Sequence, residues 1–322
     1  MRVLVTGGAG YVGSTLVTLL LADGHDVRVF DSLLHGGEAL LGFWANPGFE
    51  FRKGDVRDGS ALREAVAGVD AVVHLAAIVG DPACGRIPEL AKSTNLDASL
   101  GLLEIVKEAR VPRLVFASTC SNYGKMPDPD QWVDETSELR PVSLYAETKV
   151  AVEQVLMDPD RTGDLCATAL RFATVFGVAP RMRFDLTVNE FVAEMQIGKH
   201  LEVFGKQFWR PYIHVRDMAG AVRLVLISPE EKVRNEVFNA GSNAENYRKQ
   251  DLVEMMQPIF PDAEVSFVHK TEDPRDYRVR FDKIADRLGF QITRTVPDGI
   301  QEVKHLLDAG IISDYKAERY RN

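Results

Sequence analysis

The sequence has few cysteines, no long hydrophobic run and no excess of positive charge. Its 322 residues contain only Cys84, Cys120 and Cys166, an odd set without a Cys-x-x-Cys pair, so we expect no disulfide framework. We expect no basic leader and no membrane span, because the chain starts with a strand-like segment and lacks a sufficiently long apolar stretch. The net charge of −9 argues against nucleic acid or an anionic membrane as partner. We therefore predict a cytoplasmic protein, and we expect no metal site.

What the sequence does have is a cluster of glycines near its start. The apolar run Val3-Leu4-Val5 predicts a buried parallel strand, and residues 11–22 predict an amphipathic helix. Between them stand Gly7, Gly10 and Gly13, the spacing of a turn whose backbone N–H groups and helix N-terminus face a pyrophosphate. We expect side chains at the first two positions to hold phosphates away, and one at Gly13 to push the helix off the sheet. The predicted cofactor contacts here are Gly7, Gly10, Tyr11 and Val12.

An acid follows at the distance that ribose recognition requires. Residues 26–31 predict the next strand, and it ends in Asp31, about 20 residues beyond the glycines. A carboxylate there accepts hydrogen bonds from the adenosine ribose and repels a 2′-phosphate, which favours NAD over NADP. The alternative is that Asp31 only caps a loop. Asp55 and Val56, after the strand predicted at 49–53, are placed to meet adenine, although Asp is also a common turn residue.

Strand-like and helix-like runs alternate through the first half of the chain. Strands are predicted at 2–6, 26–31, 49–53, 70–75 and 113–118, and helices near 11–22, 59–67, 88–109 and 143–157. This alternation predicts an α/β fold with a doubly wound parallel sheet of Rossmann type. We expect a smaller C-terminal α/β lobe that holds the substrate. The predicted division is 1–175 plus 213–240 for NAD binding, and 176–212 plus 241–322 for a nucleotide sugar.

Small and hydroxyl residues follow two of these strands where ligands bind in such sheets. The strand ending at His74 leads into Leu75, Ala76 and Ala77 beside the expected cofactor path, and then into a loop at Gly80 where substrate contact is plausible. We interpret His74 itself as a core residue. The strand at 113–118 leads into Ser118 and Thr119, for which we predict cofactor contact and a catalytic role respectively.

Tyr145 and Lys149 are four residues apart on a predicted helix and therefore share one face. A tyrosine phenol with its ordinary pKa of ~10 is a poor base at neutral pH. A neighbouring ammonium and a cationic nicotinamide favour the phenolate, and we predict that they lower this pKa. The Thr119 hydroxyl can orient the same substrate oxygen. The alternative is a tyrosine and a lysine on a solvated helix face.

Together these residues resemble the extended short-chain dehydrogenase/reductase family, in its nucleotide-sugar epimerase/dehydratase branch. The resemblance spans essentially the whole chain and rests on Thr6-Gly7-Gly8-Ala9-Gly10-Tyr11-Val12-Gly13, Asp31, His74-Leu75-Ala76-Ala77, Asn95, Ser118-Thr119, Tyr145-Ala146-Glu147-Thr148-Lys149, Arg171-Phe172 and Tyr212-Ile213-His214-Val215. It implies that Tyr145 is the general base and acid. It also implies that Lys149 lowers the tyrosine pKa and holds the nicotinamide ribose, that Thr119 is the third catalytic hydroxyl, and that NAD is the cofactor.

The residues after Thr119 distinguish the branches. The dehydratases of this family carry Asp-Glu there and related decarboxylases carry a Glu, whereas this chain has Cys120 and Ser121, as in 4-epimerases. We therefore predict a nucleotide-sugar 4-epimerase that acts through a transient 4-keto sugar, with both residues near the substrate. A narrower likeness to GDP-heptose 4-dehydrogenases leaves open a 4-dehydrogenase that releases the keto sugar. A non-catalytic NAD-sensing protein is a further alternative.

Arginines gather in the second half of an otherwise acidic chain, and their fork suits a diphosphate. By resemblance Arg210 and Arg275 clamp the pyrophosphate of a nucleoside-diphosphate sugar, and Thr174 replaces an Asn that contacts it. Further predicted substrate contacts are Arg181, Arg183 and Asn189, although both arginines could be solvated surface groups. By the same resemblance the helices at 88–109 and 143–157 form a homodimer interface.

Overall fold

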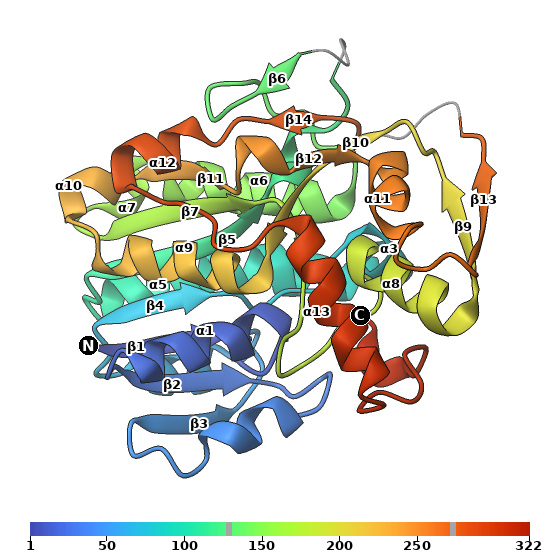
Figure 1. Ribbon diagram of the computed structural model, residues 1–322. Helices are drawn as coiled ribbons and strands as arrows, with labels where there is room; N and C mark the ends of the chain where they lie inside the picture. The colour runs from blue at the N-terminus through green and yellow to red at the C-terminus, as the bar shows by residue number, and fades with distance from the viewer. Residues whose placement is uncertain (127–130, 271–274) are drawn as a thin grey trace.

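A seven-stranded parallel sheet forms the centre of the molecule. The computed structural model describes residues 1–126, 131–270 and 275–322. The strand order is β11-β7-β5-β4-β1-β2-β3 (Figure 1), so the chain turns back between β1 and β4, the switch point at which such sheets bind ligands. The strands are β1 (Arg2–Thr6), β2 (Asp26–Asp31), β3 (Phe49–Lys53), β4 (Ala71–His74), β5 (Arg113–Thr119), β7 (Cys166–Phe172) and β11 (Glu236–Ala240). The predicted doubly wound sheet is confirmed.

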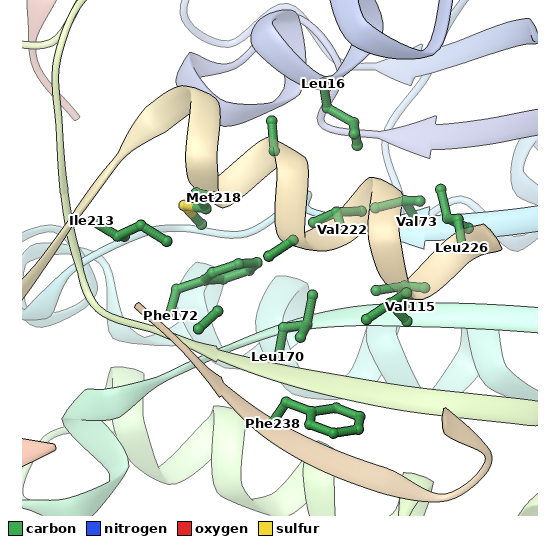
Figure 2. Packing of buried hydrophobic residues seen from close by; sticks show 14 of the residues in the cluster. Leu16, Val73, Val115, Leu170, Phe172, Ile213, Met218, Val222, Leu226 and Phe238 are labelled. Atoms are coloured by element: carbon green, nitrogen blue, oxygen red, sulfur yellow. The ribbon is translucent and has the colours of Figure 1, made fainter. Parts of the chain in front are cut away.

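Alternate residues of these strands face two different helical layers. Val5, Val73 and Val115 belong to a core shared with α1 (Tyr11–Ala22) and α9 (Val215–Ile227). Their neighbours Leu4 and Val72 belong to a core shared with α2 (Gly59–Val66), α5 (Ala98–Glu108) and α6 (Leu144–Leu156). Apolar side chains on both faces explain why the strands are continuous hydrophobic runs. Figure 2 shows the first core, where α9 packs its apolar face against the sheet.

The helix predicted at 88–109 is interrupted. It consists of α4 (Pro88–Lys92), a π-helical turn at Ser93–Asp97 and α5. Inside that turn Asn95 is buried; its Nδ2 donates to the Ile78 carbonyl at 2.9 Å and its Oδ1 accepts from the Ile78 N–H at 2.8 Å. The wider turn thus brings an amide side chain onto the segment after β4, which a regular apolar pattern does not reveal.

A smaller set of elements lies beyond the ends of the main sheet (Figure 1). It has a three-stranded sheet of β8 (Thr174–Phe176), β10 (Trp209–His214) and β12 (Asn246–Arg248), and parallel pairs of β9 (His200–Phe204) with β13 (Glu264–Val268) and β6 (Trp132–Val133) with β14 (Arg278–Val279). The remaining helices are α3 (Asp81–Arg86), α7 (Pro159–Thr162), α8 (Thr187–Ala193), α10 (Glu230–Val233), α11 (Lys249–Met256), α12 (Asp282–Leu288) and α13 (Val296–Asp308).

Of these elements, β8, β9, β10, α8, α11 and α13 share a separate hydrophobic core, in which Phe184 and Tyr212 meet Leu252 and Ile300. By contrast, Val133 of β6, Val279 of β14 and Ile284 of α12 belong to the core of the main sheet. Among the described helices, none combines the length and the apolar character that a bilayer span requires.

Candidate active site

The glycine turn between β1 and α1 is a close-packed backbone junction. The Gly10 N–H donates to the Gly7 carbonyl at 3.1 Å, and the Gly7 backbone has a φ of +75°, which favours glycine. A Cβ at Gly13 would lie 2.1 Å from the Gly7 oxygen, so a side chain there would displace α1. A Cβ at Gly7 would lie 2.7 Å from the Ala76 nitrogen. A Gly7 side chain would therefore collide first with the backbone after β4, rather than with phosphates as we predicted.

Asp31 ends β2 directly beside this turn. Its Oδ2 accepts from the Ala9 N–H at 3.0 Å and its Oδ1 accepts from the Leu33 N–H at 2.8 Å. Burial raises the pKa of Asp31, while these hydrogen bonds and the charge of Arg181 oppose the rise. Asp31 thus caps its own loop. Each carboxylate oxygen keeps a further lone pair, so the same group can also accept from a ribose hydroxyl.

Tyr145 and Lys149 lie in the first two turns of α6, on the predicted shared face. Ser143 caps this helix, since its hydroxyl oxygen accepts from the Ala146 N–H at 3.3 Å. The Lys149 Nζ donates to the Ala117 carbonyl of β5 at 2.8 Å and lies 6.0 Å from the centre of the Tyr145 ring. Lys149 is 2 % exposed, so its ammonium is held in the interior by β5 rather than by solvent.

Burial governs the electrostatics of the pair in the protein without cofactor. Burial raises the pKa of Tyr145, because the phenolate loses its hydration, and the charge of Arg183 only partly opposes this. Burial lowers the pKa of Lys149 to about 8 for the same reason. Burial therefore sets the direction of the Tyr145 pKa in the protein without cofactor. The predicted lowering includes the charge of a bound nicotinamide and stays a prediction.

The glycine turn, Asp31, Tyr145 and Lys149 all line one cavity of about 490 Å³. Predicted residues that line it are Gly7, Gly10, Tyr11, Val12, Asp31, Asp55, Val56, Leu75, Ala76, Ala77, Ser118, Thr119, Ser121, Tyr145, Lys149, Thr174, Arg181, Arg183 and Arg275. Its walls thus combine the glycine turn, the carboxyl ends of β2, β4 and β5, the start of α6 and residues of the smaller set of elements. The volume is that of a small-molecule or cofactor site.

Four predicted substrate residues lie outside the cavity wall: Gly80, Cys120, Asn189 and Arg210. The Cys120 side chain is 1 % exposed, and its thiol donates to the Arg171 carbonyl at 3.3 Å. The Asn189 amide is fully buried and holds the backbone of Gly177 and Arg183. We correct the prediction of direct substrate contact for these two side chains, because both are buried and form hydrogen bonds to backbone groups of the protein.

Arg210 and Arg275 lie around a residue that the sequence did not single out. The buried Tyr277 ring lines the cavity, and the Arg210 guanidinium lies 5.7 Å from its centre. Both arginines oppose the rise in pKa that burial causes in the Tyr277 phenol. The Tyr277 hydroxyl donates to the Ser121 Oγ at 3.5 Å. The motif Arg275-Asp276-Tyr277 was the available signal, but it does not say which way the tyrosine points.

Arg275 is also linked to the start of α6. It forms an ion pair with Asp81 at 3.2 Å, and the other oxygen of Asp81 accepts from the Ser143 hydroxyl at 2.7 Å. Asp81 therefore connects a cavity-lining arginine to the N-cap of the helix that carries Tyr145.

A buried ion pair that the sequence analysis did not identify supports α6, the helix that carries Tyr145 and Lys149. Glu153, one turn after Lys149, forms a buried ion pair with Arg171 of β7, whose Nε lies 3.1 Å from each carboxylate oxygen. The Glu153 Oε2 also accepts from the Ser118 hydroxyl at 2.7 Å. This pair ties α6 to β5 and β7, and so sets Tyr145 and Lys149 relative to Thr119.

A tyrosine and a buried lysine at the wall of a dinucleotide crevice define an NAD-using enzyme of the extended short-chain dehydrogenase/reductase type. Residues 3–241 match the model of the NAD dependent epimerase/dehydratase family, and the chain belongs to this family. NAD is therefore its cofactor, and the glycine turn, Asp31 and Lys149 would hold it.

Relatives with two activities are similar to this chain. A UDP-glucose 4-epimerase of Corynebacterium glutamicum is 31% identical over 80% of either chain. A dTDP-glucose 4,6-dehydratase of Streptomyces niveus is 31% identical over 94% of this chain and 91% of its own. The crystal structure of a Thermus thermophilus UDP-glucose 4-epimerase in complex with NAD has a TM-score of 0.81, at 28% identity, and covers 96% of this chain and 100% of its own.

Proposed function

We propose that this protein is an NAD-dependent nucleotide-sugar 4-epimerase. The observation that carries the proposal is that Tyr145, Lys149 and Thr119 line the same cavity as the glycine turn and Asp31. A sugar alcohol in this cavity can lie against both the phenol and the cofactor. When bound, NAD supplies a nicotinamide that accepts hydride from the sugar C4 and returns it.

Tyr145 is the proposed acid and base. Its phenolate oxygen removes the proton of the sugar 4-hydroxyl and later returns it to the keto oxygen. Since burial holds the proton on Tyr145 in the protein alone, the phenolate needs nearby positive charge, which Lys149 contributes from the same helix face. The Thr119 hydroxyl, at the end of β5, orients the sugar oxygen.

The cavity walls favour epimerisation over dehydration. Elimination of water from a sugar needs an acid for the leaving hydroxyl and a base for the neighbouring carbon. Among the described residues that line the cavity, the carboxylates are Asp31 and Asp55. Asp31 faces the glycine turn, and Asp55 is paired with Arg57, with 2.6 Å between Oδ2 and Nη2. The residues after Thr119 are a buried thiol and a hydroxyl, neither of which supplies such an acid and base pair.

The substrate side is proposed to consist of Ser121, Thr174, Arg183 and Arg275, with Arg210 behind Tyr277. Arg275 is the proposed contact to the diphosphate, because it lines the cavity and is held toward α6 by Asp81. Arg181 lies close enough to Asp31 to oppose its rise in pKa, so we place Arg181 nearer the cofactor than the sugar.

The test is the product formed from a panel of UDP-, GDP-, dTDP- and CDP-sugars, identified by NMR. The proposal expects one sugar to be converted to its C4 epimer without net reduction of NAD. Stoichiometric NADH together with a released 4-keto sugar would contradict it in favour of a 4-dehydrogenase. A 4-keto-6-deoxy product would show a dehydratase.

We also propose the division into an NAD-binding part, 1–175 with 213–240, and a substrate lobe, 176–212 with 241–322. Its support is that β11 joins the main sheet, whereas α8, α11 and α13 share a separate core.

We further propose a homodimer through α5 and α6. Light scattering coupled to size exclusion tests it, and a monomer at micromolar concentration would contradict it.

A further inference from the structure

The last residues of the sequence return to the catalytic cavity. The chain leaves α13 at Asp308, and a short 3₁₀ helix at Glu318–Tyr320 leads to Asn322, which lines the cavity wall. We call residues 318–322 the end segment. A stretch that is far in sequence from the glycine turn and from α6 thus contributes to the same wall as both.

The loop between β8 and α8 holds the end segment on one side. The Phe184 N–H donates to the Tyr320 carbonyl at 3.0 Å, and the two rings meet edge to face with 5.8 Å between their centres. The Arg181 Nη2 donates to the Arg321 carbonyl at 3.0 Å. The end segment is therefore fixed to this loop through its backbone as well as by ring packing.

Asn322 connects the same loop to a helix of the main sheet. Its N–H donates to the Asp185 Oδ2 at 3.2 Å, and its carbonyl oxygen accepts from the Arg86 Nη2 of α3 at 2.9 Å (Figure 1). Val79 and Leu90, just before and after α3, also line the cavity. The end segment therefore bridges two parts of the cavity wall, one from the smaller set of elements and one from the main sheet.

Two buried polar atoms at this bridge have no partner within the described ranges. No described group donates to the Asn322 side-chain oxygen, and the Arg181 Nε donates to no described acceptor. Burial and the charge of Arg183 lower the pKa of Arg181 to about 10. Because buried polar groups are normally hydrogen-bonded, a ligand that presents a donor to the first atom and an acceptor to the second would satisfy both.

A dinucleotide offers both kinds of group. Its ribose hydroxyls donate, whereas its diphosphate oxygens accept and carry negative charge. The charge of Arg181 acts on Asp31 and His35, which both line the cofactor end of the cavity. At the start of the loop, the Gly177 carbonyl accepts from the hydroxyl of Tyr11, the first residue of α1, at 2.5 Å. The loop and the end segment that it holds therefore lie on the side of the cavity where the cofactor binds.

We propose that Asn322 is a cofactor-binding residue and that the end segment closes the cavity over NAD, so that it must part from Arg86 to admit or release the cofactor. The Asn322 side-chain oxygen accepts from a ribose hydroxyl. Arg181, held by the Arg321 carbonyl, donates from Nε to the diphosphate. Arg86 is exposed, so water competes for its hydrogen bond, and the end segment opens on the side of α3.

The test is the release of NAD from the full chain with no sugar present. The protein is loaded with radiolabelled NAD, chased with excess unlabelled NAD, and the retained label is followed by filter binding. Asn322→Ala removes the acceptor and is expected to raise the rate constant of release by about fivefold, the typical contribution of one hydrogen bond.

Arg86→Ala frees the end segment without touching the cofactor. Both release and association of NAD should become about threefold faster or more, because the same opening serves both. Arg86→Lys keeps a donor at this position and should restore much of the native rate. A purely structural role for Arg86 would lower the melting temperature and leave both rates unchanged.

Ser313→Ala, in the exposed stretch before the end segment, and Arg161→Ala, on α7, are the matched controls, because neither residue lines the cavity. Both should release NAD at the native rate. Native release from Asn322→Ala or from Arg86→Ala would overturn the proposal, and so would equally fast release from the controls. Thermal melting verifies that each variant is folded. Since no sugar is present, the outcome is independent of the reaction that the protein catalyses.

Discussion

The two ends of the catalytic cavity are built in different ways. The cofactor end is made by the backbone of one contiguous strand, turn and helix, with Asp31 hydrogen-bonded to the turn itself. The catalytic and substrate end is made by side chains from α6, β5 and the smaller set of elements, tied together by the Glu153–Arg171 and Asp81–Arg275 ion pairs. The first end tolerates almost no added atom, whereas the second depends on a few charged side chains from distant segments.

The largest expected effect is at the catalytic end. Tyr145→Phe removes the acid and base, and we expect kcat to fall by about 10²–10⁴-fold. NAD should remain bound, because the glycine turn and Asp31 are untouched. Steady-state turnover of the accepted nucleotide sugar, with bound NAD measured by its release on denaturation, tests this. Turnover within a few fold of the native protein would remove Tyr145 from the mechanism.

Removing the buried ion pair tests whether distant side chains hold that end together. Glu153→Gln leaves Arg171 without its charged partner, and breaking such a pair costs about 3–5 kcal/mol in the free energy of unfolding. Urea unfolding measures it. Glu108→Gln, which breaks the exposed pair with Arg63, is the control and should cost at most about 1 kcal/mol. Equal losses of unfolding free energy in Glu153→Gln and Glu108→Gln would contradict the distinction between the buried and the exposed ion pair.

Most of the cofactor end could be predicted from the sequence, because its chemistry is local. Strands β1, β2 and β3 begin and end where expected, and Asp31 lies beside the glycines because parallel neighbours bring their carboxyl ends together. Cys120 and Asn189 could not be placed, since the groups that bury them, Arg171 and Gly177, follow from tertiary packing. The burial that raises the pKa of Tyr145 in the protein without cofactor could not be predicted for the same reason, as burial is not visible in a spacing of four residues.

A glycine exchange tests the backbone-built end. Gly13→Ala places a Cβ 2.1 Å from the Gly7 carbonyl, and we expect it to destabilise the protein by about 1–3 kcal/mol and to weaken NAD binding. Gly101→Ala in α5 is the matched control, because nothing lies within 4 Å of its Cβ. There alanine should stabilise the helix by roughly 0.5–1 kcal/mol. Thermal melts with and without NAD compare them, and an unchanged affinity in Gly13→Ala would count against this account of the turn.

The pH dependence of stability tests the buried Lys149. Its pKa in the folded protein is about 8, against an ordinary 10.5, so above pH 8 the unfolded chain binds the extra proton. Stability from this group therefore rises with pH between about 8 and 10.5, while activity falls as the ammonium is lost. Above pH 10 Tyr145 opposes that rise, because its pKa is raised and only the unfolded phenol ionises. Lys149→Met should remove this contribution from the unfolding free energy measured against pH, and an unchanged pH profile would contradict it.

The central claim is that the alcohol beside Tyr145 loses hydride from C4 and regains it within one cavity. The most direct measurement is NMR of the products formed from a nucleotide sugar that carries deuterium at C4. We predict that both C4 epimers retain the deuterium at C4 and that none enters the solvent. Loss of the label to water, or its transfer to a separate reduced cofactor pool with a keto sugar left behind, would contradict the account.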